Sequence, residues 1–101
     1  MAPDVTLREF QQRIDATYGA RDHARGIDGT FRWLVEELGE LARAVRDGDA
    51  RRLEEEFADV LAWTVSLASL CGVDAERAAG RYAGGCPKCG TAPCSCGIAG
   101  S

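Results

Sequence analysis

Four carboxylates occur in the sequence as two pairs, and the members of each pair are three residues apart. Residues with this spacing share one face of a helix, so Glu37 would project together with Glu40, and Glu56 together with Asp59. Carboxylates are rarely fully buried unless something pairs with them, yet both pairs are interleaved with apolar residues. Each pair is therefore expected to lie close to the apolar face of its helix and to need a partner.

The two pairs can also meet each other. The chain between them is long enough to finish one helix, turn and return alongside it. Four carboxylates at close quarters repel, and they would need protonation or a bound cation. Oxygen-only ligands favour Mg²⁺ or Mn²⁺, and the absence of histidine from both helix patterns disfavours a di-iron site. The alternative is that the acids are surface charges paired with nearby arginines: Arg43, Arg46, Arg51 and Arg52.

A second group with metal-ligand spacing lies near the C-terminus: Cys86, Cys89, Cys94 and Cys96. Its first half, CPKCG, is the knuckle of zinc ribbons, whereas its second half, PCSC, is tighter than a usual knuckle. Four thiolates suit tetrahedral Zn²⁺, which would supply the folding energy that a Gly-rich segment lacks. The alternatives are a disordered tail and disulfides formed during purification. The fifth cysteine, Cys71, falls in an apolar helix pattern, which predicts a buried, inert thiol.

Length and composition limit the class of protein. The chain has 101 residues, enough for one domain with a modest core, and its net charge of −4 argues against a nucleic-acid partner. No apolar run approaches the roughly 20 residues of a membrane-spanning helix, and the N-terminus lacks the pattern of a signal peptide. We therefore expect a cytoplasmic protein with reduced thiols and no membrane partner. The change in composition predicts a helical domain over residues 1–83 and a Cys-rich tail over residues 84–101.

The elements that would position both groups are helices. Thr6 and Glu9 form a capping box at the start of a first helix, and Gly19 is expected to end it. Residues 19–29 show no apolar periodicity and are interpreted as a loop, either a solvated connection or a cover over a ligand site. The only histidine, His23, lies in this segment and on its own supports neither catalysis nor metal binding.

The two carboxylate pairs belong to a predicted helical hairpin. Thr30 is expected to cap a second helix that runs to about residue 46. Asp49 is expected to cap a third helix over about residues 50–71. The turn between them, residues 47–50, is short, so the two helices should lie antiparallel.

The C-terminal part of the domain is predicted to be a short helix. Gly72 is a suitable residue to end the hairpin, and Asp74 can cap a helix over about residues 75–82. The predicted fold class is therefore all-α, an antiparallel helical bundle with a short Cys-rich tail. Three helices with apolar faces make a thin core in so short a chain, and we expect oligomerisation to complete it.

The carboxylate pairs carry a family resemblance. The strings ELGE and EFAD, fifteen residues apart, resemble the signature of the MazG-like all-α nucleoside triphosphate pyrophosphohydrolases. The flanks LVEELGELARAV and LEEEFADVLAWTVSLASLCGVD are similar too, so that the resemblance covers residues 30–75 well and residues 6–29 loosely. It implies Mg²⁺-dependent cleavage of a (deoxy)nucleoside triphosphate to the monophosphate and pyrophosphate, as house-cleaning of the nucleotide pool. It also implies a helical bundle completed by a second subunit, as a homodimer or a tetramer.

The resemblance also implies roles for residues. The Mg²⁺ ligands would be the four acids of the two pairs: Glu37, Glu40, Glu56 and Asp59. Glu36 is the candidate base that orients the attacking water. Phosphate contacts need cations, and the candidates are Arg25, Arg77 and Arg81. Trp33 or Trp63 could stack on a base, although tryptophan in an apolar helix is more often part of the core. The chain departs from the pattern of the family it resembles at Ala79 and Gly80, where members of that family often carry Lys and Asn.

A function of another class is compatible with the same sequence. In this alternative the protein is a non-catalytic helical adaptor. The cysteine knuckle would bind a partner protein, and the acidic helices would hold a structural ion only.

Overall fold

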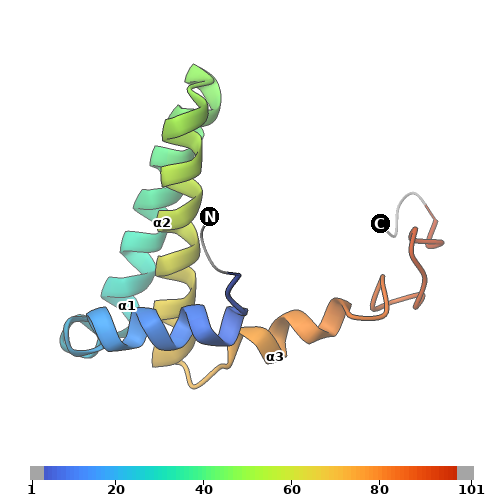
Figure 1. Ribbon diagram of the computed structural model, residues 1–101, viewed down its shortest axis with the longest axis horizontal. Coiled ribbons are helices and arrows are strands. Elements are labelled where there is room, and N and C mark those ends of the chain that lie inside the picture. Colours follow the sequence, from blue (N-terminus) through green and yellow to red (C-terminus); the bar gives the residue numbers. More distant parts are fainter. Residues whose placement is uncertain (1–3, 98–101) are drawn as a thin grey trace.

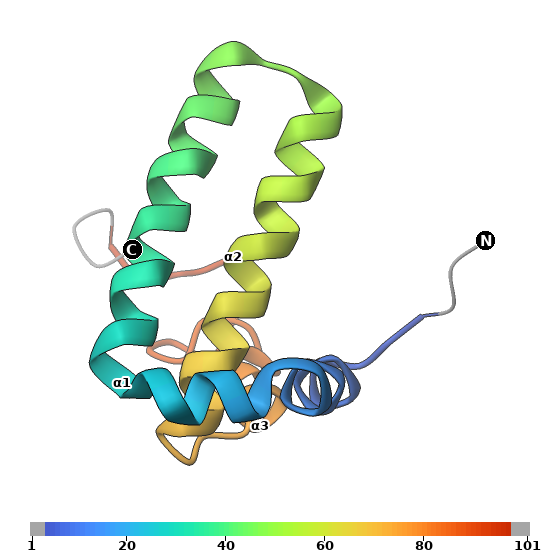
Figure 2. The same ribbon diagram turned by 90° about the vertical axis from the view of Figure 1, so that its left-hand side faces the viewer.

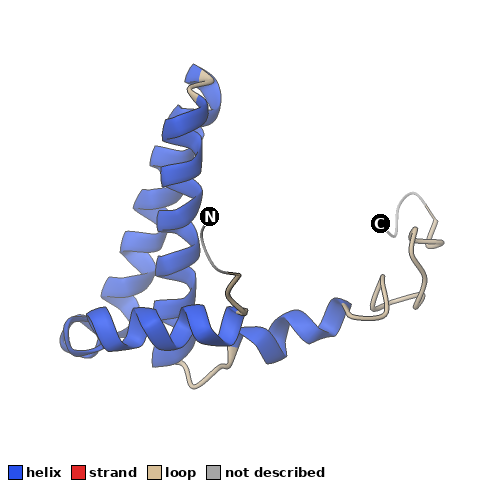
Figure 3. Cartoon of the chain, in the orientation of Figure 1, coloured by secondary structure: helices blue, strands red, loops and turns tan. Residues whose placement is uncertain are grey.

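The computed structural model describes residues 4–97, and their regular structure is entirely helical (Figures 1 and 3). The elements are α1 (Leu7–Asp47), α2 (Ala50–Leu70), α3 (Ala75–Ala79) and a 3₁₀ helix, η1 (Gly80–Tyr82). The predicted all-α class is confirmed for this part of the chain.

Helix α1 is bent. It starts at the predicted capping box, in which the Thr6 hydroxyl accepts from the Glu9 N–H and the Glu9 carboxylate accepts from the Thr6 N–H. Gly26 interrupts it with a backbone conformation that is not helical, φ 83° and ψ 176°. A residue with a side chain rarely adopts this positive φ, so glycine is suited to the bend. Figure 1 shows the result: the first part of α1 crosses the base of the molecule, and the rest rises beside α2.

Three sequence predictions for this region are wrong. Gly19 does not end the first helix, and the expected loop over residues 19–29 is helical on both sides of Gly26. Thr30 does not cap a helix, because it lies inside α1 with a fully buried side chain. A single glycine within a helix costs only about 1 kcal/mol relative to alanine, and the alanines and arginines around Gly19 favour helix strongly enough to continue it.

The second part of α1 and α2 form the predicted antiparallel hairpin (Figure 2). Gly48 ends α1 in the left-handed conformation, φ 72°, and its N–H donates to the Ala44 carbonyl. The Asp49 carboxylate then accepts from the N–H groups of Arg51 and Arg52 at 3.1 and 3.3 Å, which confirms it as the N-cap of α2. The turn is therefore closed on both sides by side-chain or backbone caps.

The end of α2 differs from the prediction at one residue. Gly72 takes the expected left-handed conformation, φ 74°, and the Val73 N–H donates to the Ala68 carbonyl, as in a Schellman motif. Cys71 was expected to be buried, but it is exposed. The reason is its place: it is the C-cap residue, which follows the last residue of α2.

Polar contacts join the start of α1 to the end of α2 and to α3. The buried side chain of Gln11 donates to Ser69 Oγ and to the Val73 carbonyl, and it accepts from the Ala75 N–H. Asp74 caps α3 as predicted, and its carboxylate also accepts from the Arg8 guanidinium at 2.8 Å. The first part of α1 is thereby held across the end of the hairpin.

The apolar core is thin. Only Ala44 and Val65 are buried apolar residues within residues 4–97. Many large apolar side chains on the hairpin are exposed instead: Phe31, Trp33, Val35, Leu38, Val45, Phe57 and Leu61. This agrees with the sequence argument for a partner subunit, which stays a prediction. Among the described residues no helix could cross a membrane alone; only α2 and Ala75–Tyr82 taken together pass on length and composition, and they are bent by 107°.

Candidate metal and nucleotide site

Three carboxylates from the two arms of the hairpin come together. Glu37 belongs to α1, and Glu56 and Asp59 belong to α2; one oxygen of each lies within 4.8 Å of one oxygen of the other two. The spacing of three residues places both α2 acids on the side that faces α1. We call these three residues the carboxylate cluster.

The cluster lacks a counter-charge of its own. Burial is the main cause that raises the pKa of Glu37, followed by a hydrogen bond with Glu56 and by repulsion from Asp59, Glu56 and Glu40. Glu56 Oε2 is buried and has no hydrogen-bond partner. An acceptor in this state is costly unless something pairs with it. A hard divalent cation such as Mg²⁺ fits the cluster, because all its donors are carboxylate oxygens.

Two predicted acids stand outside this cluster. Glu40 forms ion pairs with Arg43, three residues along α1, and with Arg52 of α2 at 3.7 Å. Glu36 is exposed and lines a separate shallow hollow with Phe31 and Gly39. The alternative interpretation, in which the acids are surface charges paired with arginines, thus describes Glu40 but not the three acids of the carboxylate cluster.

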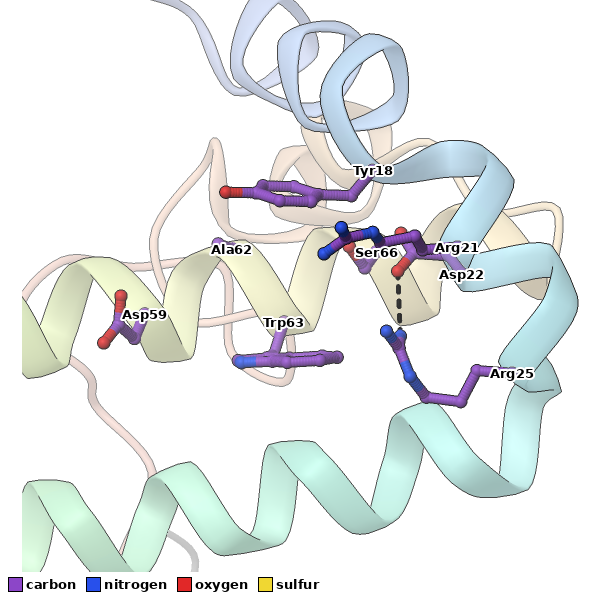
Figure 4. A pocket seen from close by; sticks show the side chains of 8 residues that line it. All are labelled: Tyr18, Arg21, Asp22, Arg25, Asp59, Ala62, Trp63 and Ser66. Carbon is purple, nitrogen blue, oxygen red and sulfur yellow. Dashed lines mark hydrogen bonds and ion pairs between the residues drawn. The ribbon is translucent and has the colours of Figure 1, made fainter.

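A pocket of about 230 Å³ adjoins the cluster through Asp59 (Figure 4). Its lining combines two aromatic rings with charged and small residues: Tyr18, Arg21, Asp22, Arg25, Asp59, Ala62, Trp63 and Ser66. In Figure 4 the rings of Tyr18 and Trp63 lie on opposite sides of the pocket, with Asp59 at one end. Ligand pockets usually enclose about 300–1,000 Å³, so this one would hold only part of a nucleotide.

Arg25 is held firmly in this pocket. Its Nη1 lies 2.9 Å from Asp22 Oδ1 and 3.4 Å from the Thr30 hydroxyl, and its guanidinium carbon lies 4.8 Å from the centre of the Trp63 ring. Asp22 is only 3% exposed. A planar guanidinium that both pairs with a carboxylate and stacks on an aromatic ring loses little further freedom when a ligand arrives. Arg25, a predicted phosphate contact, is therefore placed where a ligand could meet it.

The other predicted substrate contacts lie elsewhere. Arg77 on α3 and Arg81 on η1 are exposed and do not line this pocket. Trp33 stacks on Trp63, with ring centres 6.0 Å apart and planes inclined by 14°, so it supports the pocket wall without being part of it.

Sequence reasoning missed most of the lining from α1. Tyr18, Arg21, Asp22 and Arg25 fall at positions i, i+3, i+4 and i+7, which is one face of a helix. This signal was present in the sequence. It was hidden because residues 19–29 were interpreted as a loop for want of apolar periodicity.

The four tail cysteines also come together, in a separate group that we call the thiol cluster (Cys86, Cys89, Cys94 and Cys96). Their four Sγ atoms all lie within 4.8 Å of one another. Hydrogen bonds from Ser95 and Thr91 lower the pKa of the Cys89 thiol to about 4. The predicted convergence of these four side chains is thus found in the structure.

Comparison with known proteins adds two findings. Residues 25–83 match the family described as the MazG nucleotide pyrophosphohydrolase domain. The chain is also similar to the histidine biosynthesis bifunctional protein HisIE of Deinococcus radiodurans, with 33% identity over 84 residues. The matched part is 71% of this chain but only 38% of that relative, so the chain spans well under two thirds of the relative's length.

Proposed function

The chain belongs to the MazG nucleotide pyrophosphohydrolase domain family, and from this premise we propose that it hydrolyses a nucleoside triphosphate between the α- and β-phosphates. The products would be the nucleoside monophosphate and pyrophosphate. The observation that carries the proposal is the carboxylate cluster, three converging acids with a buried unpaired oxygen, at the end of a pocket with aromatic walls. We also propose house-cleaning of the nucleotide pool as the cellular role.

Glu37, Glu56 and Asp59 would hold Mg²⁺, with Mn²⁺ as a possible substitute. When bound, the ion neutralises charge on the phosphoryl oxygens and makes a water molecule more acidic. The chain itself positions the ligands: all three carboxylates extend from helices α1 and α2, and none lies on a loop. Glu36 has no place in this proposal, since it is exposed and lies outside the cluster.

Glu40 can still serve as a fourth ligand. Its carboxylate would have to leave Arg43 and Arg52, and the Arg52 side chain is 37% exposed. Exposed ion pairs contribute only about 0–1 kcal/mol, so this rearrangement costs little compared with binding a divalent cation. Arg52 would then be released next to the metal site.

The pocket would bind the nucleoside end of the substrate. A nucleobase has two flat apolar faces, which suit the space between the Tyr18 and Trp63 rings (Figure 4). Asp59 belongs both to this pocket and to the carboxylate cluster, so a base held there would direct its phosphates towards the metal. Arg21 and Arg25 supply positive charge at the end of the pocket away from Asp59 (Figure 4).

We further propose that the functional form is a homodimer or a tetramer. The exposed apolar side chains of the hairpin, such as Phe57 and Leu61 at 53% and 50% exposure, would lose contact with water in such an assembly. The pocket is small in one chain, and a second subunit could enlarge it. Sedimentation equilibrium tests this proposal; a monomer at micromolar concentration would contradict it.

The test of the catalytic proposal is a panel of ribo- and deoxynucleoside triphosphates incubated with the protein and Mg²⁺. Pyrophosphate and nucleoside monophosphate are measured together, since release of inorganic phosphate would indicate a different cleavage site. Excess EDTA should abolish the release. Glu37→Gln should do the same with retained helicity, whereas Glu55→Gln, an exposed acid paired with Arg51, is the matched control. No pyrophosphate from any nucleotide would refute catalysis and leave the non-catalytic helical adaptor as the better function.

A further inference from the structure

The thiol cluster has the dimensions of a metal site. Cys86 Sγ lies 3.8 Å from Cys96 Sγ, and Cys89 Sγ lies 3.9 Å from Cys94 Sγ. Tetrahedral Zn²⁺ has Zn–S bonds of about 2.3 Å, which puts neighbouring sulfurs about 3.8 Å apart. A disulfide would need about 2.05 Å, and all four cysteines are free. Each of these sulfur pairs therefore has the separation of two ligands on one ion.

The backbone around the first two cysteines is folded tightly enough to fix them. The Cys86 N–H donates to the Thr91 carbonyl at 2.9 Å, and the Gly90 N–H donates to the Cys86 carbonyl at 2.6 Å. Gly85 has φ 98°, and a Cβ at this position would lie 2.6 Å from the Thr91 carbonyl oxygen. The turn thus needs glycine both for its conformation and for the close approach of the two backbone segments.

Further donors point at the sulfurs. The Ser95 N–H donates to Cys89 Sγ at 3.3 Å, and the Cys96 N–H donates to Cys94 Sγ at 3.4 Å. Hydrogen bonds of this kind orient metal-bound thiolates and offset part of their negative charge. The Ser95 contact joins the second half of the motif to the first, and all four sulfurs lie within 4.8 Å of one another.

We propose that the thiol cluster binds one Zn²⁺ as a closed structural site, separate from the nucleotide chemistry. Sulfur-only tetrahedral ligation selects zinc or iron over Mg²⁺, and four protein ligands leave no open position for a substrate. The described part of the tail after η1 has no buried residue, so no apolar core accounts for its order. Metal binding would supply that free energy. The inference does not depend on the proposed hydrolysis.

The experiment uses the chain of 101 residues, purified under reducing conditions and dialysed without added metal. Elemental analysis should find about one zinc ion per chain. Cys94→Ser should lose this zinc, whereas Cys71→Ser, which changes the cysteine outside the cluster, should keep it. In the native protein only Cys71 should react quickly with a thiol reagent, and the other four cysteines should react after the zinc is chelated. Far-UV circular dichroism shows whether each variant keeps the helices.

Four results would overturn the proposal. The first is metal-free protein in which all five thiols react. The second is a protein mass 2 Da below that of the reduced chain, which would reveal a disulfide. The third is bound iron, with its visible absorption, in place of zinc, and the fourth is a loss of zinc from Cys71→Ser equal to that from Cys94→Ser. If Cys94→Ser loses its helicity as well as its zinc, chelation of the native protein decides: the proposal requires zinc to leave while the helical signal remains.

Discussion

The carboxylate cluster and the thiol cluster both gather metal-binding side chains, but they do so by opposite means. Glu37, Glu56 and Asp59 are brought together by two long helices that pack on each other. The four cysteines lie in a short segment of turns whose described residues have no buried side chain. The first site is built by the fold before any ion arrives. In the second, by our proposal, the ion builds the local fold.

The donor sets differ in the same sense. The carboxylate cluster offers three oxygen donors and adjoins a pocket, so a bound ion would keep positions open for a substrate oxygen. The thiol cluster offers four sulfur donors, which would fill a tetrahedral ion completely. An open site with hard oxygen donors suits chemistry on phosphates, whereas a closed site with soft sulfur donors suits structure. Four predictions test this contrast, and they follow in order of expected effect.

The largest effect should separate the two sites by function. Asp59→Asn should lower kcat/KM for nucleotide hydrolysis by about 100-fold or more, because a charged oxygen is lost from the cluster beside the pocket. Its zinc content should equal that of the wild type. Glu54→Gln, an exposed acid on the same helix, serves as the control and should retain wild-type turnover. Unchanged turnover in Asp59→Asn would remove this residue from the site, and a change in zinc would show that the sites are linked.

Removal of the proposed zinc should show that the thiol cluster depends on metal for its local structure, whereas the helical hairpin does not. After chelation, the backbone amides of residues 86–96 should lose their protection from hydrogen exchange, because no apolar core remains to order them. Amides in the middle of α1 and α2 should keep theirs. Mass spectrometry of peptic fragments resolves the two regions. A tail that stays protected without metal would mean that protein contacts alone order it.

A smaller effect should appear at the bend that positions the pocket. Gly26→Ala should lower the free energy of unfolding by about 1–3 kcal/mol, since Gly26 has φ 83° and ψ 176°, a conformation that alanine rarely adopts. Gly19→Ala is the matched control. Gly19 lies inside the helix with nothing within 4 Å of an added Cβ, so alanine there should raise stability by about 0.5–1 kcal/mol. Urea unfolding measures both, and equal effects would mean that the backbone at Gly26 is not strained by a side chain.

The smallest effect concerns the cap of α2. Asp49→Ala should lower stability by about 1 kcal/mol, because the N–H groups of Arg51 and Arg52 lose their acceptor. Asp49→Ser keeps a capping oxygen, and its free energy of unfolding should differ from that of the wild type by only a few tenths of the loss expected for Asp49→Ala. Neither variant should alter zinc content. If Asp49→Ala is as stable as Asp49→Ser, water satisfies these groups and the cap contributes nothing.

Much of the fold could be predicted because its signals are local. Thr6, Asp49 and Asp74 cap the helices they were expected to cap, and Gly72 ends α2. Caps and left-handed glycines act within a few residues, so the sequence contains all that is needed to recognise them. The same holds for the i, i+3 spacing that brings Glu56 and Asp59 to one face.

The prediction of a loop over residues 19–29 failed for a physical reason. Apolar periodicity reports a helix face that packs on an apolar core. The part of α1 between Gly19 and Gly26 presents polar side chains to a pocket, where Asp22 pairs with Arg25. It therefore shows no apolar stripe, and the prediction of a loop followed. The sequence offered Arg43 and Arg52 as partners for all four acids, but which acid meets them depends on side-chain rotamers, and only the structure assigns both to Glu40.

The bend at Gly26 makes the geometry of the carboxylate cluster depend on the number of residues between Gly26 and Glu37. Beyond it α1 is helical to its end, and each residue of a helix turns the next side chain by about 100°. The number of residues between Gly26 and Glu37 therefore fixes whether the carboxylate points at α2 or away from it. Insertion or deletion of one residue there would leave every motif recognisable in the sequence and yet turn Glu37 away from Glu56 and Asp59. For this site, the spacing from Gly26 to Glu37 therefore matters as much as the identity of the acid.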